Sequence, residues 1–80
     1  MEAPAPLQSA ADEQDGVTIS RREYEDENVI TVDFGRGVEA KLDVVGETAI
    51  VVAGDRQFEF EIPEEATEVT TNDGMLIIKE

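Results

Sequence analysis

The stretch Phe58-Glu59-Phe60-Glu61-Ile62-Pro63 decides how the rest of this chain is interpreted. Three apolar residues alternate with two glutamates, which is the pattern of a strand with one buried face and one solvated face. Pro63 cannot donate a backbone hydrogen bond to a neighbouring strand, so it ends the pattern. Downstream, Asn72-Asp73-Gly74 fits a three-residue hairpin loop with Gly74 in the left-handed position, and Met75–Ile78 supplies a last hydrophobic strand.

The residues before this stretch show the same organisation of short strands separated by glycine turns. Gly46-Glu47 and Gly54-Asp55 fit two-residue hairpin turns with glycine in the first position. We expect four further strands, at residues 17–24, 28–34, 38–44 and 48–53. The regular spacing and the lack of a helical pattern in residues 16–80 predict an all-β fold, a small antiparallel β-sandwich. The residues expected to face its core are Ile30, Val32, Phe34, Val38, Ala40, Leu42, Val44, Ile50, Val52, Phe58, Phe60, Ile62, Val69, Leu76 and Ile78.

The N-terminal residues have a different composition. Residues 1–15 contain two prolines and four acids without a base, and their apolar residues follow no strand or helix period. Such a segment cannot bury enough apolar surface to offset the entropy lost on ordering. The sequence therefore predicts a disordered acidic tail at residues 1–15 and one sandwich domain at residues 16–80.

The composition excludes several kinds of chemistry. The chain has no cysteine, which rules out disulfides and thiolate metal sites. It has no histidine, the usual zinc ligand and the usual base near neutral pH. The acid-rich segment at residues 23–27 does not match the spacing of an EF-hand loop. We expect no enzyme activity, no catalytic residues, no metal and no cofactor.

The charge is strongly negative along the whole chain. Twenty acidic residues stand against six basic ones, which gives a net charge of −14. This balance favours solubility at high ionic strength, as in halophilic proteins. A second interpretation is an acidic surface that mimics nucleic acid or binds a basic partner. Direct binding of nucleic acid is not expected, because the few basic residues are scattered.

The sequence contains no membrane signal. The longest uninterrupted apolar run, Ala49–Ala53, is far shorter than the ~20 residues of a membrane-spanning helix. No signal peptide is visible at the N-terminus. We expect a soluble, cytoplasmic protein without a membrane partner.

The order of these motifs resembles the alpha-crystallin domain of small heat-shock proteins, in which Phe-x-Leu-Pro is followed by Asn-Gly-Val-Leu and a closing strand. Two earlier segments are similar to that family as well: residues 32–37 to its Ala-Asp-Leu-Pro-Gly corner, and residues 50–55 to its Leu-x-Ile-x-Gly-Glu strand end. The resemblance spans residues 29–79 and implies an alpha-crystallin-like sandwich, a fold that co-chaperone CS domains share. Only Arg56 and Gln57 separate Asp55 from Phe58, where the family has a long loop with the strand exchanged between protomers. We therefore expect a monomer or weak dimer.

One apolar surface is a candidate for partner binding. Met75 and Ile77 alternate with the inward residues of the last strand, and Val51 does the same in the strand at residues 48–53. If these two strands are neighbours, the three side chains form a strip outside the core. Val17 and Ile19 of the first strand then either cover this strip or leave it open to a partner. The predicted site is Val51, Met75, Ile77, Val17 and Ile19.

Two functions fit these observations. The resemblance implies a non-enzymatic protein-interaction module with chaperone-like activity toward protein clients. The alternative is an acidic decoy or inhibitor that binds a basic protein partner.

Overall fold

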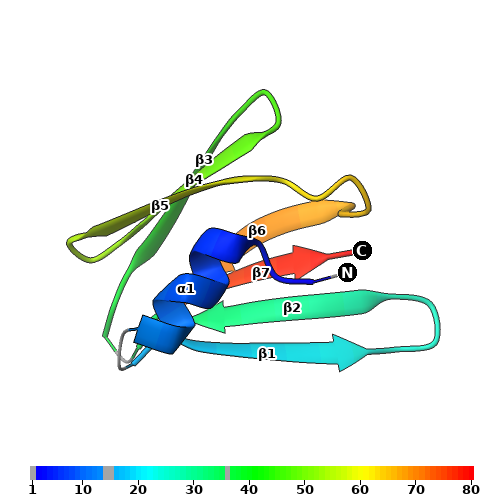
Figure 1. Cartoon of the computed structure of the whole chain (residues 1–80), viewed down its shortest axis with the longest axis horizontal. Helices are drawn as coiled ribbons and strands as arrows, with labels where there is room; N and C mark the ends of the chain where they lie inside the picture. Colours follow the sequence, from blue (N-terminus) through cyan, green and yellow to red (C-terminus); the bar gives the residue numbers. More distant parts are fainter. Residues whose placement is uncertain (1, 14–15, 36) are drawn as a thin grey trace.

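Two antiparallel sheets face each other in the computed structural model, which describes residues 2–13, 16–35 and 37–80 (Figure 1). Sheet A has the strand order β1-β2-β7-β6, and sheet B has the order β3-β4-β5. The bounds in sheet A are β1 (Thr18–Glu23), β2 (Asn28–Asp33), β7 (Met75–Lys79) and β6 (Glu68–Asn72). Those in sheet B are β3 (Ala40–Val45), β4 (Thr48–Ala53) and β5 (Arg56–Glu61). This arrangement confirms the predicted small all-β sandwich.

Strand β5 has the predicted alternation. Phe60 is buried, with 4% of its surface exposed, whereas Glu59 and Glu61 point to solvent. Phe58 is half-buried and stacks on Phe34, with the ring centroids 5.5 Å apart. Because Phe34 directly follows β2 of sheet A, this aromatic pair links the two sheets.

The turn between β6 and β7 differs from the predicted three-residue loop. Asn72 pairs with Met75, so the turn has two residues, and Asp73 takes the left-handed conformation with φ 54°. Gly74 is required for a different reason. A Cβ atom at Gly74 would lie 2.5 Å from the carbonyl oxygen of Val38, so only glycine lets the turn approach this backbone.

The register of β4 also differs from the prediction. Ile50 and Val52 were expected to face the core, but Ala49, Val51 and Ala53 are the buried residues. The strand is apolar on both faces, so its own pattern does not define the buried face. Pairing with β5 does, because Ala49 lies opposite Phe60 in the register. The small alanine leaves room for the phenylalanine ring on the inner face.

The N-terminal segment is ordered, which corrects the prediction of a disordered tail for residues 2–13. Helix α1 (Ala5–Glu13) buries Leu7 completely and Ala10 almost completely, in the same core cluster as the sheets. The backbone N–H groups of Leu7 and Gln8 both donate to the carbonyl oxygen of Pro4, at 3.0 and 3.1 Å. Residues 1, 14 and 15 of the predicted tail lie outside the described residues.

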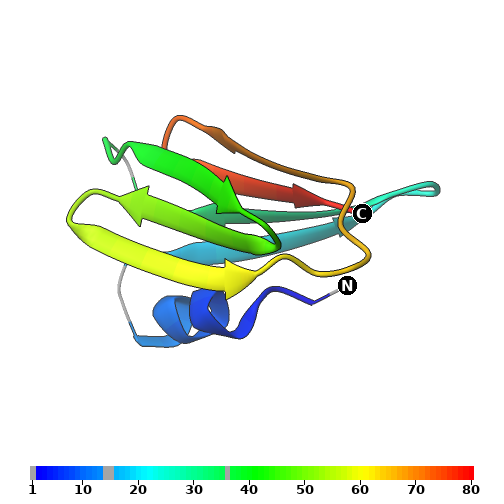
Figure 2. The ribbon, with the colours of Figure 1, turned by 90° about the horizontal axis from the view of Figure 1, so that it is seen from above.

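Helix α1 forms because it packs against an open side of the sandwich. The two sheets leave an open side between β1 and β5, and α1 contacts both strands there (Figure 2). Leu7 and Ala10 are three residues apart, so they share one helix face. A nine-residue helix is marginal by itself and is stabilised by such packing rather than by its own sequence.

Candidate interaction surface

Along one edge, the backbone of β3 has no partner strand among the described residues. The N–H of Ala40 donates to the carbonyl oxygen of Asp73, at 3.1 Å, and therefore points away from β4. Hydrogen-bonded and non-bonded positions alternate along an antiparallel pair. By this alternation Lys41 and Asp43 bond to β4, whereas the N–H and C=O groups of Leu42 and Val44 point outward. Within the described residues, β3 has no strand neighbour on that side.

Valine side chains are exposed on β3 and on the neighbouring strand β4. The exposed fractions are 47% for Val44, 62% for Val45 and 39% for Val52. Val44 lies on the inward-facing row of β3, opposite Ala49, but the β3–β4 hairpin projects away from sheet A (Figure 1). The prediction that Val44 is a core residue is therefore wrong, because its side chain is exposed. The side chain does point to the predicted face of the strand. The hairpin presents apolar side chains on both faces.

In the described part of the chain, no helix covers the side of the sandwich at this edge. Helix α1 lies against β5 and β1, whereas β3 and β6 form the opposite side of the molecule (Figure 2). Leu42 of β3 and Val69 of β6 are half-buried there and pack against the core cluster. We define the β3 edge as Leu42 and Val44 with their outward backbone groups, together with the exposed side chain of Val45.

The structure separates the partner strip that the sequence predicts. Val51 is fully buried in β4 of sheet B, so it does not reach the surface. Met75 and Ile77 lie half-buried on the outer face of β7 in sheet A. Strands β4 and β7 belong to different sheets, so the assumption that they are neighbours is wrong. A partner role of Met75 and Ile77 stays a prediction.

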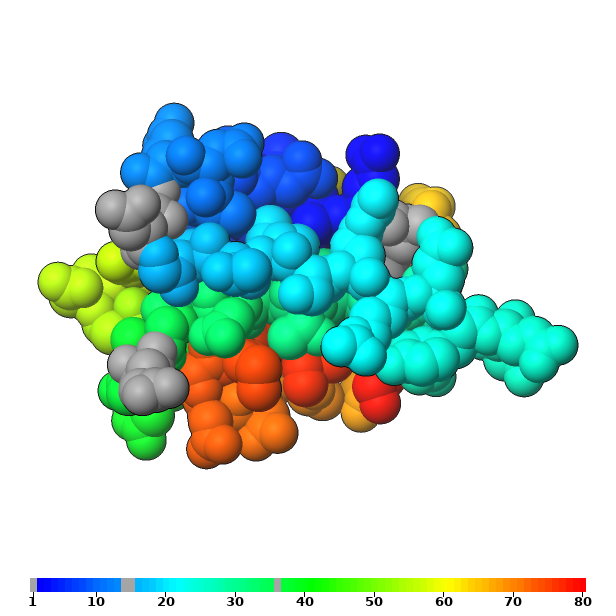
Figure 3. Space-filling view, turned by 90° about the horizontal axis from the view of Figure 1, so that it is seen from below, coloured from blue at the N-terminus to red at the C-terminus, as the bar shows by residue number. Residues whose placement is uncertain are grey.

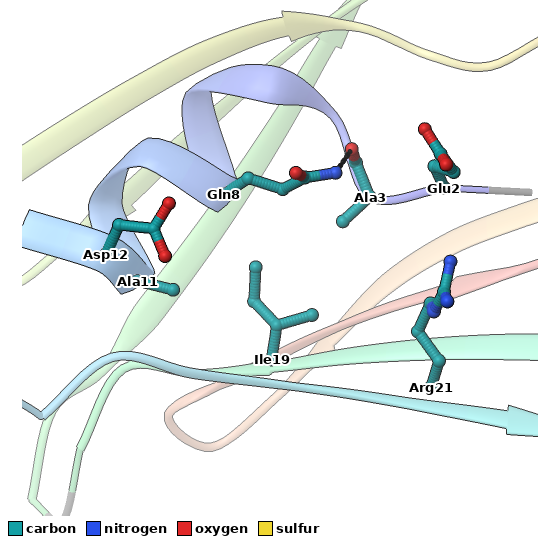
Figure 4. A pocket seen from close by; sticks show the side chains of 7 residues that line it. All are labelled: Glu2, Ala3, Gln8, Ala11, Asp12, Ile19 and Arg21. Carbon is teal, nitrogen blue, oxygen red and sulfur yellow. Dashed lines mark hydrogen bonds between the residues drawn. The ribbon is translucent and has the colours of Figure 1, made fainter.

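The two first-strand residues lie elsewhere as well. Val17 is buried just before β1. Ile19 points from β1 toward α1 and lines a hollow of about 640 Å³ between them (Figure 4). At this hollow Gln8 Nε2 donates to the carbonyl oxygen of Ala3, at 2.7 Å, and Arg21 extends toward Glu2. Val17 and Ile19 therefore do not cover Met75 and Ile77.

The sequence contained a signal for the exposed valines. Val44 and Val45 are adjacent, and adjacent side chains in a strand point to opposite faces. One of the two must therefore leave the core, directly before the Gly46-Glu47 turn. The unpaired backbone groups of β3 could not be predicted in the same way. They depend on the order of the strands in the sheet, and the local sequence pattern does not determine that order.

In residues 2–13, 16–35 and 37–80, no group of three or more acidic side chains is placed to hold a metal ion. Helix α1, the one helix in that part of the chain, is not long and apolar enough to cross a membrane.

Comparison with known proteins places the chain in a family. No curated protein and no solved structure matches it. The model of a family of unknown function, DUF7127, matches residues 1–80. The chain therefore belongs to this family of unknown function, DUF7127.

Proposed function

We propose that the protein is a non-enzymatic interaction module that binds extended apolar segments of client proteins along the β3 edge. The unpaired N–H and C=O groups of Leu42 and Val44 carry this proposal. An extended peptide that adds to such an edge gains main-chain hydrogen bonds, and its alternate side chains contact the surface beside the strand. Val44 and Val45 supply apolar contacts on the two faces.

A chaperone-like role fits the charge of the molecule. An exposed apolar edge strand normally invites aggregation, and natural proteins protect such edges with charged side chains. Lys41 and Asp43 are exposed on the outer face of β3, and the whole chain carries a net charge of −14. We propose that the protein has this chaperone-like role in the cytoplasm, as a monomer or weak dimer, in line with its resemblance to small heat-shock domains.

The test is suppression of client aggregation by variants of the β3 edge. Insulin reduced with dithiothreitol is a suitable client, because the protein itself has no cysteine. Light scattering should fall at a near-stoichiometric ratio of the wild-type protein in about 1 M KCl, where charge repulsion is screened. Val44→Pro should abolish this effect, because proline removes an outward N–H group while the bonds from Lys41 and Asp43 to β4 remain.

Val52→Lys is the matched control. Val52 is also an exposed valine, but it lies in β4, which is paired on both sides. This variant should suppress aggregation as the wild type does, and melts should show all three proteins folded. Equal suppression by Val44→Pro and the wild type would overturn the proposal. Binding to one basic protein only, lost in salt, would favour the acidic decoy instead.

A further inference from the structure

A second surface lies on the outer face of sheet A. A hollow of about 540 Å³ opens where the β1–β2 hairpin meets β2 and β7. Its apolar lining comes from Val29 of β2, Ile77 of β7 and the ring of Tyr24. Figure 3 views the molecule from the side of sheet A, with this hairpin projecting at one end. We call this surface the hairpin hollow.

The hollow combines half-buried aliphatic residues with an exposed aromatic one. Val29 and Ile77 are half-buried, whereas 55% of the Tyr24 surface is exposed. Thr31 pairs with Ile77 in the register and lines the hollow beside it. The surface is therefore a shallow hollow with aliphatic residues in its floor and an exposed tyrosine among its lining residues.

The turn side of the hollow is acidic, whereas Arg22, which lies opposite Val29 in the register, brings a positive charge to the side of β1. Glu25, Asp26 and Glu27 form the hairpin turn, and the N–H of Tyr24 donates to the carbonyl oxygen of Glu27, at 2.7 Å. All three acids are exposed, and none is in an ion pair with another described residue. The one lysine at the hollow, Lys79, lies 3.7 Å from the carboxylate of Glu68, which offsets its charge.

We propose that the hairpin hollow binds a short basic segment of a partner protein, in which one leucine or isoleucine is flanked by lysines or arginines. The aliphatic side chain contacts Val29 and Ile77, and the flanking cations lie near the carboxylates of the turn. A cation can also lie over the face of the Tyr24 ring. Complementary charge of this kind sets the association rate and the choice of partner more than the affinity. The hollow is on sheet A, so this inference is independent of client binding at the β3 edge.

The fluorescence of Tyr24 can be used to measure this binding. It is the only tyrosine, and the chain has no tryptophan, so the intrinsic fluorescence comes from this ring. The probe is the capped peptide Lys-Arg-Leu-Lys-Lys, which has no aromatic residue. We expect a saturable change in fluorescence at the lowest KCl concentration that keeps the protein folded, and weaker binding in 1 M KCl. Replacing the leucine of the peptide with serine should weaken binding by about tenfold.

Two double variants with the same change in charge distinguish binding at the hollow from general electrostatic attraction of the peptide to the acidic protein. Glu25→Gln combined with Glu27→Gln should weaken binding several-fold, because the lost carboxylates border the hollow. Glu59→Gln combined with Glu61→Gln removes two exposed acids from the outer face of sheet B and should leave the affinity unchanged. Equal losses in the two double variants, equal binding of the serine peptide, or an unchanged Tyr24 signal would each overturn the inference.

Discussion

In about 0.01 M KCl we expect most of the protein to be unfolded, and we expect its melting temperature to climb steeply as KCl is raised to 1 M. The screening length falls from about 30 Å to about 3 Å over this range. The longest dimension of the molecule is 33 Å, so at low salt nearly every charge interacts with the others. Unfolding spreads these charges apart, so repulsion favours the unfolded chain.

The structure shows few contacts that offset this repulsion. Among the described residues the one ion pair joins Lys79 Nζ to Glu68 Oε2 at 3.7 Å, and the two side chains are 41% and 52% exposed. Exposed pairs of this kind contribute about 0.2–1 kcal/mol. The domain of residues 16–80 carries sixteen acids and six bases, and the described part of residues 2–13 adds acids only. With a stability at or below the usual ~5–15 kcal/mol, repulsion decides whether this domain folds.

Melts followed by circular dichroism at several KCl concentrations measure this effect. A variant in which Glu25, Glu59, Glu61 and Glu64 are changed to glutamine is the control. All four side chains are exposed, so the changes remove charge without disturbing the core. The melting temperature of this variant should rise less with salt than that of the wild type. A melting temperature of the wild type that does not depend on KCl would contradict the prediction.

Phe60→Ala should destabilise the protein by about 3–5 kcal/mol, the usual range for truncation of a buried phenylalanine. Phe60 lies in β5 opposite Ala49, and Pro4, Ala5 and Pro6 at the start of α1 border the surface around it. Truncation of the ring leaves a cavity beside Ala49, whose small side chain does not fill it. The loss is comparable to the whole stability of a small domain, so most of the variant should be unfolded.

Glu61→Gln is the control for this prediction. Glu61 follows Phe60 in the chain and is exposed on the outer face of sheet B. Its replacement should change the free energy of unfolding by less than about 0.5 kcal/mol. Urea unfolding in 1 M KCl measures both variants. Similar small losses in the two variants would show that Phe60 is not a core residue.

The strands and hairpin turns of the sandwich could be predicted because their signals are local. Phe58, Phe60 and Ile62 alternate with two glutamates over five residues, and Gly46 and Gly54 have the positive φ values that their turns need. Strand β4 lacked such a signal, since Ile50 is apolar like both of its chain neighbours. Its register depends on the partner residues in β3 and β5, which are known only once the strands are paired.

The order of helix α1 and the unpaired β3 edge could not be predicted from the sequence, because both depend on the assembled fold. Leu7 is the one large apolar residue among small and acidic neighbours, and this composition is typical of disorder. It becomes ordered because the two sheets leave a side open that a helix can cover. The unpaired backbone of Leu42 and Val44 likewise follows from the position of β3 at the end of sheet B. The five residues predicted to form one apolar strip are separated in the structure for the same reason, because the neighbours of a strand are a non-local property.

Hydrogen exchange of the β3 amides tests the proposed function most directly. The ligand is the capped peptide Thr-Val-Thr-Val-Thr, which models an extended client segment, in about 1 M KCl. We predict that the peptide slows exchange at Leu42 and Val44, whose N–H groups point outward, and leaves Lys41 and Asp43 unchanged, because these already bond to β4. Unchanged exchange at Leu42 and Val44 under saturating peptide would contradict the account.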